Sequence, residues 1–275
     1  MNWTERDREV WQQVQEWIHT LHQEELNDFK RTYEKWVNKG LSLIPEKFTE
    51  AFFGKLDTWL FHLNALIQSL EIQDDTRKRI LRSARIFDEN IHTISDMKNL
   101  TIDQASYISD QYSARHRLYS FVQGGITGTG KKIILSTDFL VMILLNLRAV
   151  QITAMSYGYE IKTPYEMMTS LKVFHAATLP KHLKGNAWEQ LMIDLEQSQY
   201  FYEGTEQVTT FEWLEEPFKQ LVKACFISSF HKEKDSKLSL IPIVIGAGVN
   251  YKFSKKVTDF ADTYYKYRYL QDKGC

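Results

Sequence analysis

Residues that break helices are scarce in this chain. Its 275 residues include 12 glycines and 5 prolines, about half of the ~12% that average usage would give the two together. Sandwiches and barrels of β-strands need many tight turns, which draw on glycine and proline. The shortage favours long helices joined by few turns, and a hydrophobic content of 43% is enough to build a sizeable core. We therefore expect an all-α fold, a single multi-helix domain.

Charge and cysteine content exclude several other classes of protein. The 34 Lys and Arg residues nearly balance the 35 Asp and Glu residues, so no nucleic-acid partner is expected. Cys225 and Cys275 form no Cys-x-x-Cys pair, which argues against a disulfide framework and against a zinc module. The segment from Met1 to Asp7 is charged and does not read as a signal peptide. We expect a cytoplasmic location, with peripheral attachment to the inner face of the cell membrane as an open alternative.

Hydrophobic residues recur with a period near that of a helix along most of the chain. From Thr4 to Asn38 the pattern predicts one long helix closed by Gly40, because glycine is common just past a helix end. Thr163, Pro164 and Glu166 predict another helix start, since they supply an N-cap, a first-position proline and the glutamate of a capping box.

Later helices are predicted less sharply. We expect one from about Asn186 to Tyr200, one capped at Thr209 and interrupted near Pro217, and a last tyrosine-rich helix that runs toward Leu270.

Two glycine-rich segments border the most apolar parts of the chain. Glycine lets backbones approach closely, so we expect both segments to be helix junctions. The same composition occurs where helices meet in lipid, and the sequence leaves the two settings open. The glycines concerned are Gly124, Gly125, Gly128, Gly130, Gly246 and Gly248.

The apolar run from Ile133 to Ala154 carries Asp138 and Arg148, and Tyr157-Gly158-Tyr159 predicts the end of the helix that it forms. A charge at mid-bilayer costs about 2.5–3.5 kcal/mol, so a helix buried in a protein core is favoured over a membrane anchor, with shallow insertion as the alternative. About 15 Å of helix rise separates the two charges, which cannot pair within one straight helix. Each therefore needs another partner when it is buried. Either other helices neutralise them, or they line a polar pocket.

One nucleotide-binding pattern is incomplete. Gly125-x-x-x-x-Gly130-Lys131 matches the start of a P-loop, but Lys132 stands where a Ser or Thr must hold Mg²⁺. A P-loop also follows a strand, whereas residues 101–123 read as a helix. The histidines show no metal-ligand spacing, and no nucleophile motif is present. We predict no cofactor, no metal site and no catalytic residue.

Five cations stand close together at the start of a further helix. They are Arg77, Lys78, Arg79, Arg82 and Arg85. Such a cluster indicates either a solvated helix face or a contact with anionic lipid headgroups or a partner's acids. Lys131, Lys132 and the last helix with Lys255 and Lys256 would extend the same basic surface.

The order and spacing of several short segments resemble the EcsC protein family. The resemblance covers about residues 40–270, so that residues 1–40 would be an N-terminal helical extension of a single domain over residues 1–275. Lys131-Lys132 departs from the family, in which small or apolar residues more often follow. The matching segments are Gly124-Gly125-x-x-Gly128, Asp138, Asn146-Leu147-Arg148-Ala149, Tyr157-Gly158-Tyr159 and Pro242-x-x-x-Gly246-Ala247-Gly248-Val249-Asn250-Tyr251, then Ala261, Tyr264 and Arg268.

This resemblance implies a cellular role but no specific chemical reaction. EcsC-like proteins are typically bacterial, the namesake is encoded beside an ABC transporter, and the family supplies no catalytic residues to carry over. It implies a non-catalytic accessory protein near the membrane, with a lipid surface or ABC transporter subunits as partners. The alternative is a protein that binds a lipid or another hydrophobic ligand, or an unrecognised hydrolase, with its site near Asp138, Arg148 and Asn250.

Overall fold

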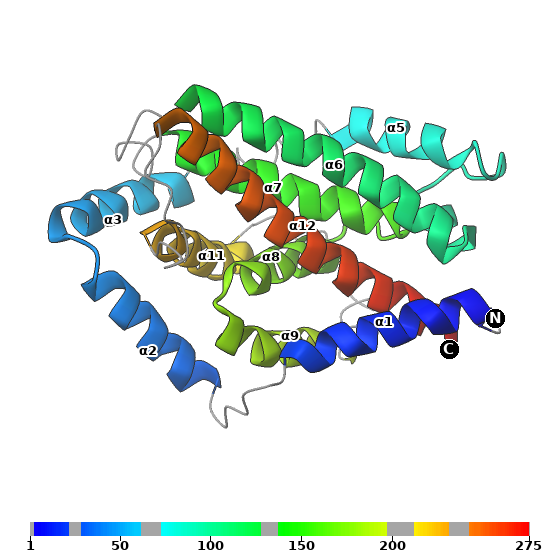
Figure 1. Cartoon of the computed structure of the whole chain (residues 1–275), viewed down its shortest axis with the longest axis horizontal. Helices are drawn as coiled ribbons and strands as arrows, with labels where there is room; N and C mark the ends of the chain where they lie inside the picture. Colours follow the sequence, from blue (N-terminus) through cyan, green and yellow to red (C-terminus); the bar gives the residue numbers. More distant parts are fainter. Residues whose placement is uncertain are drawn as a thin grey trace.

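The computed structural model describes residues 3–21, 29–61, 73–127, 137–196, 212–230 and 242–274. This part of the chain folds into helices with no strand among its residues, which confirms the predicted all-α domain. A 3₁₀ turn, η2 (Ser95–Asn99), separates two of the helices. The helices, shown in Figure 1, are α1 (Glu5–Leu21), α2 (Phe29–Ser42), α3 (Glu46–Phe61), α5 (Gln73–Ala84), α6 (Ile102–Thr127), α7 (Thr137–Ser156), α8 (Pro164–Thr178), α9 (Lys181–Glu196), α11 (Glu212–Phe230) and α12 (Pro242–Gly274).

The long helix α12 is the axis of the bundle. It crosses the molecule in Figure 1 and packs most extensively on α6, then on α7, α8 and α1. Ser109 of α6 bonds to Asp262 and Ser120 of α6 bonds to Ser254, so α6 and α12 run antiparallel. Most of the core is therefore built around one helix.

The tyrosines of α12 face this core. Tyr264, Tyr265 and Tyr269 are all buried, and the ring of Trp188 from α9 meets Tyr264 edge to face. These three side chains therefore do not contribute to the basic surface that the sequence predicts for the last helix. The aromatic residues serve helix packing instead.

The two ends of the described chain lie side by side (Figure 1). The indole Nε1 of Trp3 donates to the carbonyl oxygen of Leu270 at 3.1 Å. Lys273 reaches the buried Asp7 with Nζ–O distances of 2.8 and 3.0 Å. These contacts fasten α1 along the C-terminal half of α12.

The N-terminal segment forms two helices rather than the one predicted. α1 packs on α12 and α9, whereas α2 packs on α11 and α9, and Figure 1 shows the two helices pointing in different directions. Residues 22–28 lie outside the described part of the chain. The hydrophobic period continues because each helix buries its own stripe against different neighbours.

Gly40 was predicted to close a helix, but it lies inside α2. A Cβ atom there would stand 2.5 Å from Cγ2 of the buried Ile227 in α11. The residue is thus a point of close helix contact.

Two other boundaries differ from prediction. α9 begins at Lys181, earlier than the predicted Asn186. Pro217 lies inside α11 instead of interrupting it. Proline has no amide hydrogen to donate to the carbonyl four residues earlier, yet the helix continues through it.

The boundary between α7 and α8 follows its local sequence closely. Gly158 has a φ of 89°, and the amides of Gly158 and Tyr159 bond to the carbonyls of Met155 and Ala154, both at 3.1 Å. This pattern is a Schellman motif. Thr163 then caps α8, because its hydroxyl oxygen accepts from the amide of Glu166 at 3.3 Å. Both predicted boundaries are confirmed.

The glycine-rich segments overlap the ends of helices. Gly246 and Gly248 lie in the first two turns of α12, at the start of a helix as predicted, whereas α6 runs on through Gly124 and Gly125. Gly128 and Gly130 lie outside the described residues. Across the described ranges, none of the helices combines the length and the apolar character that a membrane crossing requires.

Candidate functional site

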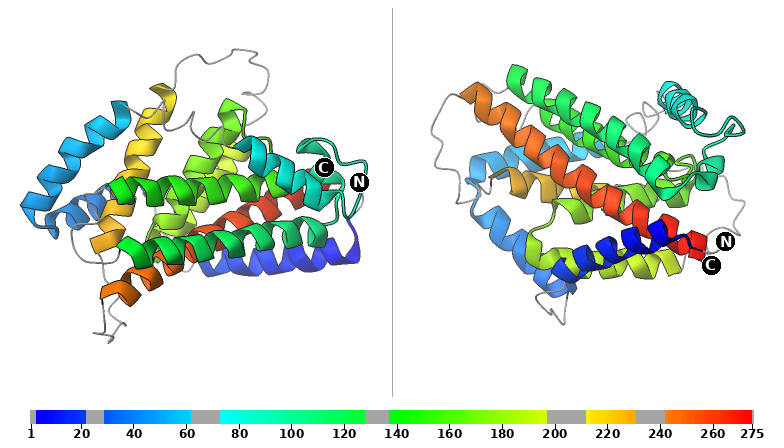
Figure 2. Two further views of the ribbon diagram at one scale, coloured as in Figure 1. Left: turned by 90° about the horizontal axis from the view of Figure 1, so that it is seen from above. Right: turned by 45° about the vertical axis from the view of Figure 1, so that its right-hand side comes forward.

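Helix α5 presents the predicted basic residues on the outside of the bundle, next to α6 and α7 (Figures 1 and 2). Lys78, Arg79, Arg82 and Arg85 are exposed. Arg77 differs from them, because it is partly buried and forms an ion pair with Glu160 at 2.8 Å. Of the other predicted cations, Lys131 and Lys132 lie outside the described residues. Lys255 forms an ion pair with Asp259, and Lys256 donates to the carbonyl oxygens of Thr178 and Leu179.

Exposed apolar side chains continue this basic face. Ile86 is 81% exposed and Phe87 is 39% exposed, directly after the last turn of α5. The Phe87 ring meets Tyr107 of α6 edge to face, and Tyr107 is itself 60% exposed. We call Lys78, Arg79, Arg82, Arg85, Ile86 and Phe87 together the α5 surface.

Arg148 extends from α7 toward the base of α5. Its guanidinium is half-buried and donates from Nη2 to Oγ1 of Thr76 at 2.7 Å. Burial, and secondarily the charge of Arg79, lowers the pKa of Arg148. No described carboxylate forms an ion pair with it, so the predicted neutralisation by other helices is not found in the described part of the chain.

The other residues of the predicted pocket are not brought to Arg148 by any described contact. Asp138 lies in the first turn of α7, and its side chain is outside the described part of the structure. Pro242 opens α12, and Asn250 is partly buried in the same helix. Among the described contacts, no hydrogen bond joins Asn250 to Arg148.

A chain of polar groups crosses the core between α6, α7 and α12. Ser254 Oγ lies 2.8 Å from Asn146 Oδ1 and 2.7 Å from Ser120 Oγ, and Ser120 Oγ lies 3.4 Å from His116 Nε2. Because Asn146 Oδ1 can only accept, the hydroxyl of Ser254 donates to it and that of Ser120 donates to Ser254. His116 then donates from Nε2, and burial lowers its pKa to about 4, which keeps the ring neutral.

A buried ion pair joins α8 to α12. The guanidinium of Arg268 donates to both oxygens of Glu166 at 2.6 and 2.7 Å. The Arg268 and Glu166 side chains are only 5% and 2% exposed. Burial opposes the charge of Arg268, but the hydrogen bonds and charge of Glu166 outweigh burial and raise the pKa of Arg268.

Most of the chain matches a known protein family. A model of the EcsC protein family matches residues 8–270. The chain belongs to this family. The match begins before the segment in which the resemblance was predicted, and it includes most of α1.

One curated relative of this EcsC chain is the uncharacterized protein YdbA of Bacillus subtilis (strain 168). The two are 24% identical over 162 residues, which is 55% of this chain and 60% of YdbA. The matched region thus spans less than two thirds of that relative. No solved structure matches this EcsC chain.

Several residues that carry the EcsC resemblance, among those whose side chains the structure describes, lie in the core. Asn146 and Arg268 belong to the buried contacts above, and the hydroxyl of Tyr157 donates to Asp262 at 2.8 Å. Gly158 ends α7 with its positive φ. Arg148 differs from these residues, since no carboxylate of the described residues forms an ion pair with it.

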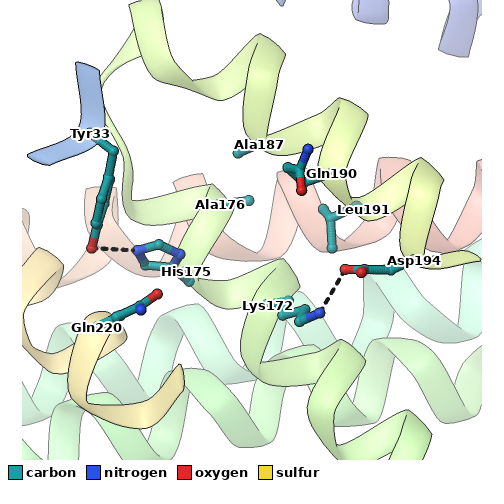
Figure 3. Close-up of a pocket in the computed structure, with 9 residues that line it drawn as sticks. All are labelled: Tyr33, Lys172, His175, Ala176, Ala187, Gln190, Leu191, Asp194 and Gln220. Carbon is teal, nitrogen blue, oxygen red and sulfur yellow. Dashed lines mark hydrogen bonds and ion pairs between the residues drawn. The ribbon is translucent and has the colours of Figure 1, made fainter. Parts of the chain in front are cut away.

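The EcsC chain also has a pocket that the sequence did not predict (Figure 3). It has a volume of about 200 Å³ and lies among α2, α8, α9 and α11. His175 lies 3.1 Å from the Tyr33 hydroxyl, and Lys172 forms an ion pair with Asp194 at 2.8 Å. Burial lowers the pKa of His175 to about 4. The lining residues are Tyr33, Lys172, His175, Ala176, Ala187, Gln190, Leu191, Asp194 and Gln220.

This pocket offers hydrogen-bonding groups but little net charge, because Lys172 and Asp194 neutralise each other. Its residues come from four helices, of which only α8 and α9 are consecutive in sequence, so no motif spacing could reveal it. Over the described ranges, the structure brings together no group of three His, Cys, Asp or Glu side chains that would hold a metal ion.

Proposed function

We propose that this EcsC-family protein is a non-catalytic helical protein that docks on an anionic membrane surface through the α5 surface. The observation that carries the proposal is the combination of charge and exposed hydrophobicity there. Lys78, Arg79, Arg82 and Arg85 form no ion pair with any described residue, and the highly exposed Ile86 follows them directly.

The physical basis is the addition of two weak attractions. Each Lys or Arg close to an anionic leaflet contributes about 1 kcal/mol, and a side chain such as Ile86 contributes about 1.5–3 kcal/mol when it leaves water. A cationic helix face with adjacent apolar residues is typical of reversible attachment at the headgroup level. The exposed acids Asp75 and Glu89 lie at the two ends of this segment and leave its middle positive.

Docking at a membrane would also bring the protein to the ABC transporter subunits that the family resemblance implies as partners. The ligand-binding alternative near Asp138, Arg148 and Asn250 stays a prediction. The pocket of Figure 3 is lined by other residues, and its charged groups Lys172 and Asp194 pair with each other.

Vesicle flotation tests the proposal. We expect the protein to float with phosphatidylcholine vesicles that contain phosphatidylserine, and to stay behind with pure phosphatidylcholine or at high salt. Arg82→Gln should lower the partition coefficient about fivefold, the equivalent of one cation of ~1 kcal/mol. Ile86→Ser should lower it about tenfold or more.

Lys181→Gln is the matched control. This exposed cation begins α9, on the opposite side of the bundle from α5 (Figure 1), and its loss should leave flotation unchanged. Equal losses for Arg82→Gln and Lys181→Gln would mean that net charge alone drives binding. No flotation of the wild-type chain at low salt would refute membrane docking.

A further inference from the structure

Arg148 is the feature of the α5 region that the docking proposal does not explain. A half-buried guanidinium normally has a carboxylate beside it, because taking its charge out of water costs free energy. Here the hydroxyl of Thr76 is the hydrogen-bond partner, and no described carboxylate forms an ion pair with Arg148. Several N–H donors of this guanidinium therefore have no protein acceptor in the described part of the chain.

A second cation stands beside Arg148. Thr76 and Arg79 are three residues apart in α5 and so occupy the same face of the helix. The charge of Arg79 contributes to the lowered pKa of Arg148, so the two cations lie within electrostatic reach of each other. Arg79 has no ion-pair partner among the described residues either, and the nearest exposed acid on α5, Asp75, forms no ion pair with it.

We propose that Arg148, Arg79 and Thr76 form a phosphate-binding site at the junction of α5 and α7. The inference deepens the proposed membrane function and rests on it for the source of the phosphate, a lipid headgroup. The two guanidinium groups supply forked donors. The hydroxyl of Thr76, which accepts from Arg148, has its own hydrogen left to donate.

The donor set selects the chemistry of the ligand. A carboxylate is satisfied by a single guanidinium fork, whereas a phosphate offers oxygens in three directions and carries up to two negative charges. Two neighbouring arginines without an acid between them repel each other until such an anion lies between them. The site is half-buried, so its ion pairs would be screened by salt less than those of the exposed α5 cations.

Vesicles of matched surface charge test the site. One set contains phosphatidic acid, which has a phosphate monoester headgroup, and the other contains phosphatidylserine, each in phosphatidylcholine. We expect the wild-type chain to bind the phosphatidic acid vesicles about tenfold more tightly, the effect of one added charge-assisted hydrogen bond. Arg148→Gln and Arg79→Gln should reduce this preference to about twofold or less.

Arg82→Gln is the control, because it removes the same charge from α5 without touching Arg148 or Thr76. It should weaken binding to both vesicle types and preserve their ratio. Far-UV circular dichroism and the thermal midpoint establish that each variant is folded, and Arg79→Gln changes an exposed side chain that the fold does not need.

A second probe, glycerol 3-phosphate followed by titration calorimetry, separates the two sources of phosphate. Arg148-dependent binding of this compound without vesicle binding would support the site and refute membrane docking. Vesicle binding with no preference for phosphatidic acid, or with a preference that survives Arg148→Gln, would overturn the site and leave docking intact. Binding of neither probe would overturn both proposals.

Discussion

Arg268 keeps its charge inside the core because Glu166 meets it with both carboxylate oxygens. The Cζ atom of Arg268 also lies 3.9 Å from the centre of the Tyr159 ring, a cation–π contact. The pair is therefore stabilised by hydrogen bonds and by the aromatic ring. Either residue without the other would be a buried polar group that lacks a partner.

Removal of one member should destabilise the protein strongly. We expect Glu166→Gln to lower the free energy of unfolding in urea by about 3–5 kcal/mol, because it leaves the Arg268 charge buried without a counter-charge. The double variant Glu166→Met/Arg268→Met should lose less than this single variant. Lys255→Gln, which removes an exposed ion pair with Asp259, should cost at most about 0.5 kcal/mol. A loss of that small size for Glu166→Gln would contradict the account.

His116 makes the stability of the core depend on pH. Its pKa falls from 6.5 to about 4 through burial, so the unfolded chain takes up the proton first as the pH drops. The stabilising contribution is complete above about pH 6.5 and is lost as the pH falls toward 4. His175, whose pKa is also lowered to about 4, acts in the same direction.

A comparison with His116→Gln isolates the contribution of His116. Between pH 7 and about pH 4.5 we expect the wild-type chain to lose ~2–3 kcal/mol more unfolding free energy than this variant, since a pKa difference of one unit is worth ~1.4 kcal/mol. Urea unfolding at the two pH values measures the difference. Parallel losses in the two proteins would show that His116 does not titrate in this way.

At the scale of elements, two glycines in neighbouring helices have opposite roles. Gly40 in α2 abuts Ile227, with a prospective Cβ–Cγ2 distance of 2.5 Å, whereas a Cβ at Gly54 in α3 would meet nothing within 4 Å. Space for a methyl group thus exists at one position and not at the other.

Alanine at the two positions should shift stability in opposite directions. Gly54→Ala should raise the free energy of unfolding by up to about 1 kcal/mol through helix propensity. Gly40→Ala should lower it by about 1–3 kcal/mol, because overpacking against Ile227 outweighs that gain. Leucine lacks the Cγ2 branch of isoleucine. The double variant Gly40→Ala/Ile227→Leu should therefore recover part of the unfolding free energy that Gly40→Ala loses. Thermal or urea unfolding measures all four proteins, and a stabilised Gly40→Ala would disprove the close contact.

The sequence predicted those elements whose signals are local. Gly158 and Thr163 mark the end of α7 and the start of α8 within a few residues, and both act as predicted. Gly40 was misread because a glycine at a helix end and a glycine at a close helix contact look alike in sequence. The contact depends on Ile227, which a remote helix supplies.

At the scale of the whole molecule, the sequence predicted the charged residues of the candidate site but not the contact between α5 and α7. Arg148 stood out as a charge in an apolar helix, and the cations of α5 stood out as a cluster. That Arg148 meets Thr76, 72 residues away in sequence, is a result of tertiary packing that no spacing encodes. The pocket between Tyr33 and Asp194 was invisible for the same reason, since α2, α8, α9 and α11 supply its walls.

The central position of α12 also has a consequence for biosynthesis. The ribosome makes α12 after every other described helix, yet α1, α6, α7 and α8 all pack against it. Of the described helices, α1 is made first and must wait for α12 before Trp3 and Asp7 can contact Leu270 and Lys273. Until then the chain exposes the apolar faces that α12 will cover, and such exposed apolar surface favours aggregation during synthesis.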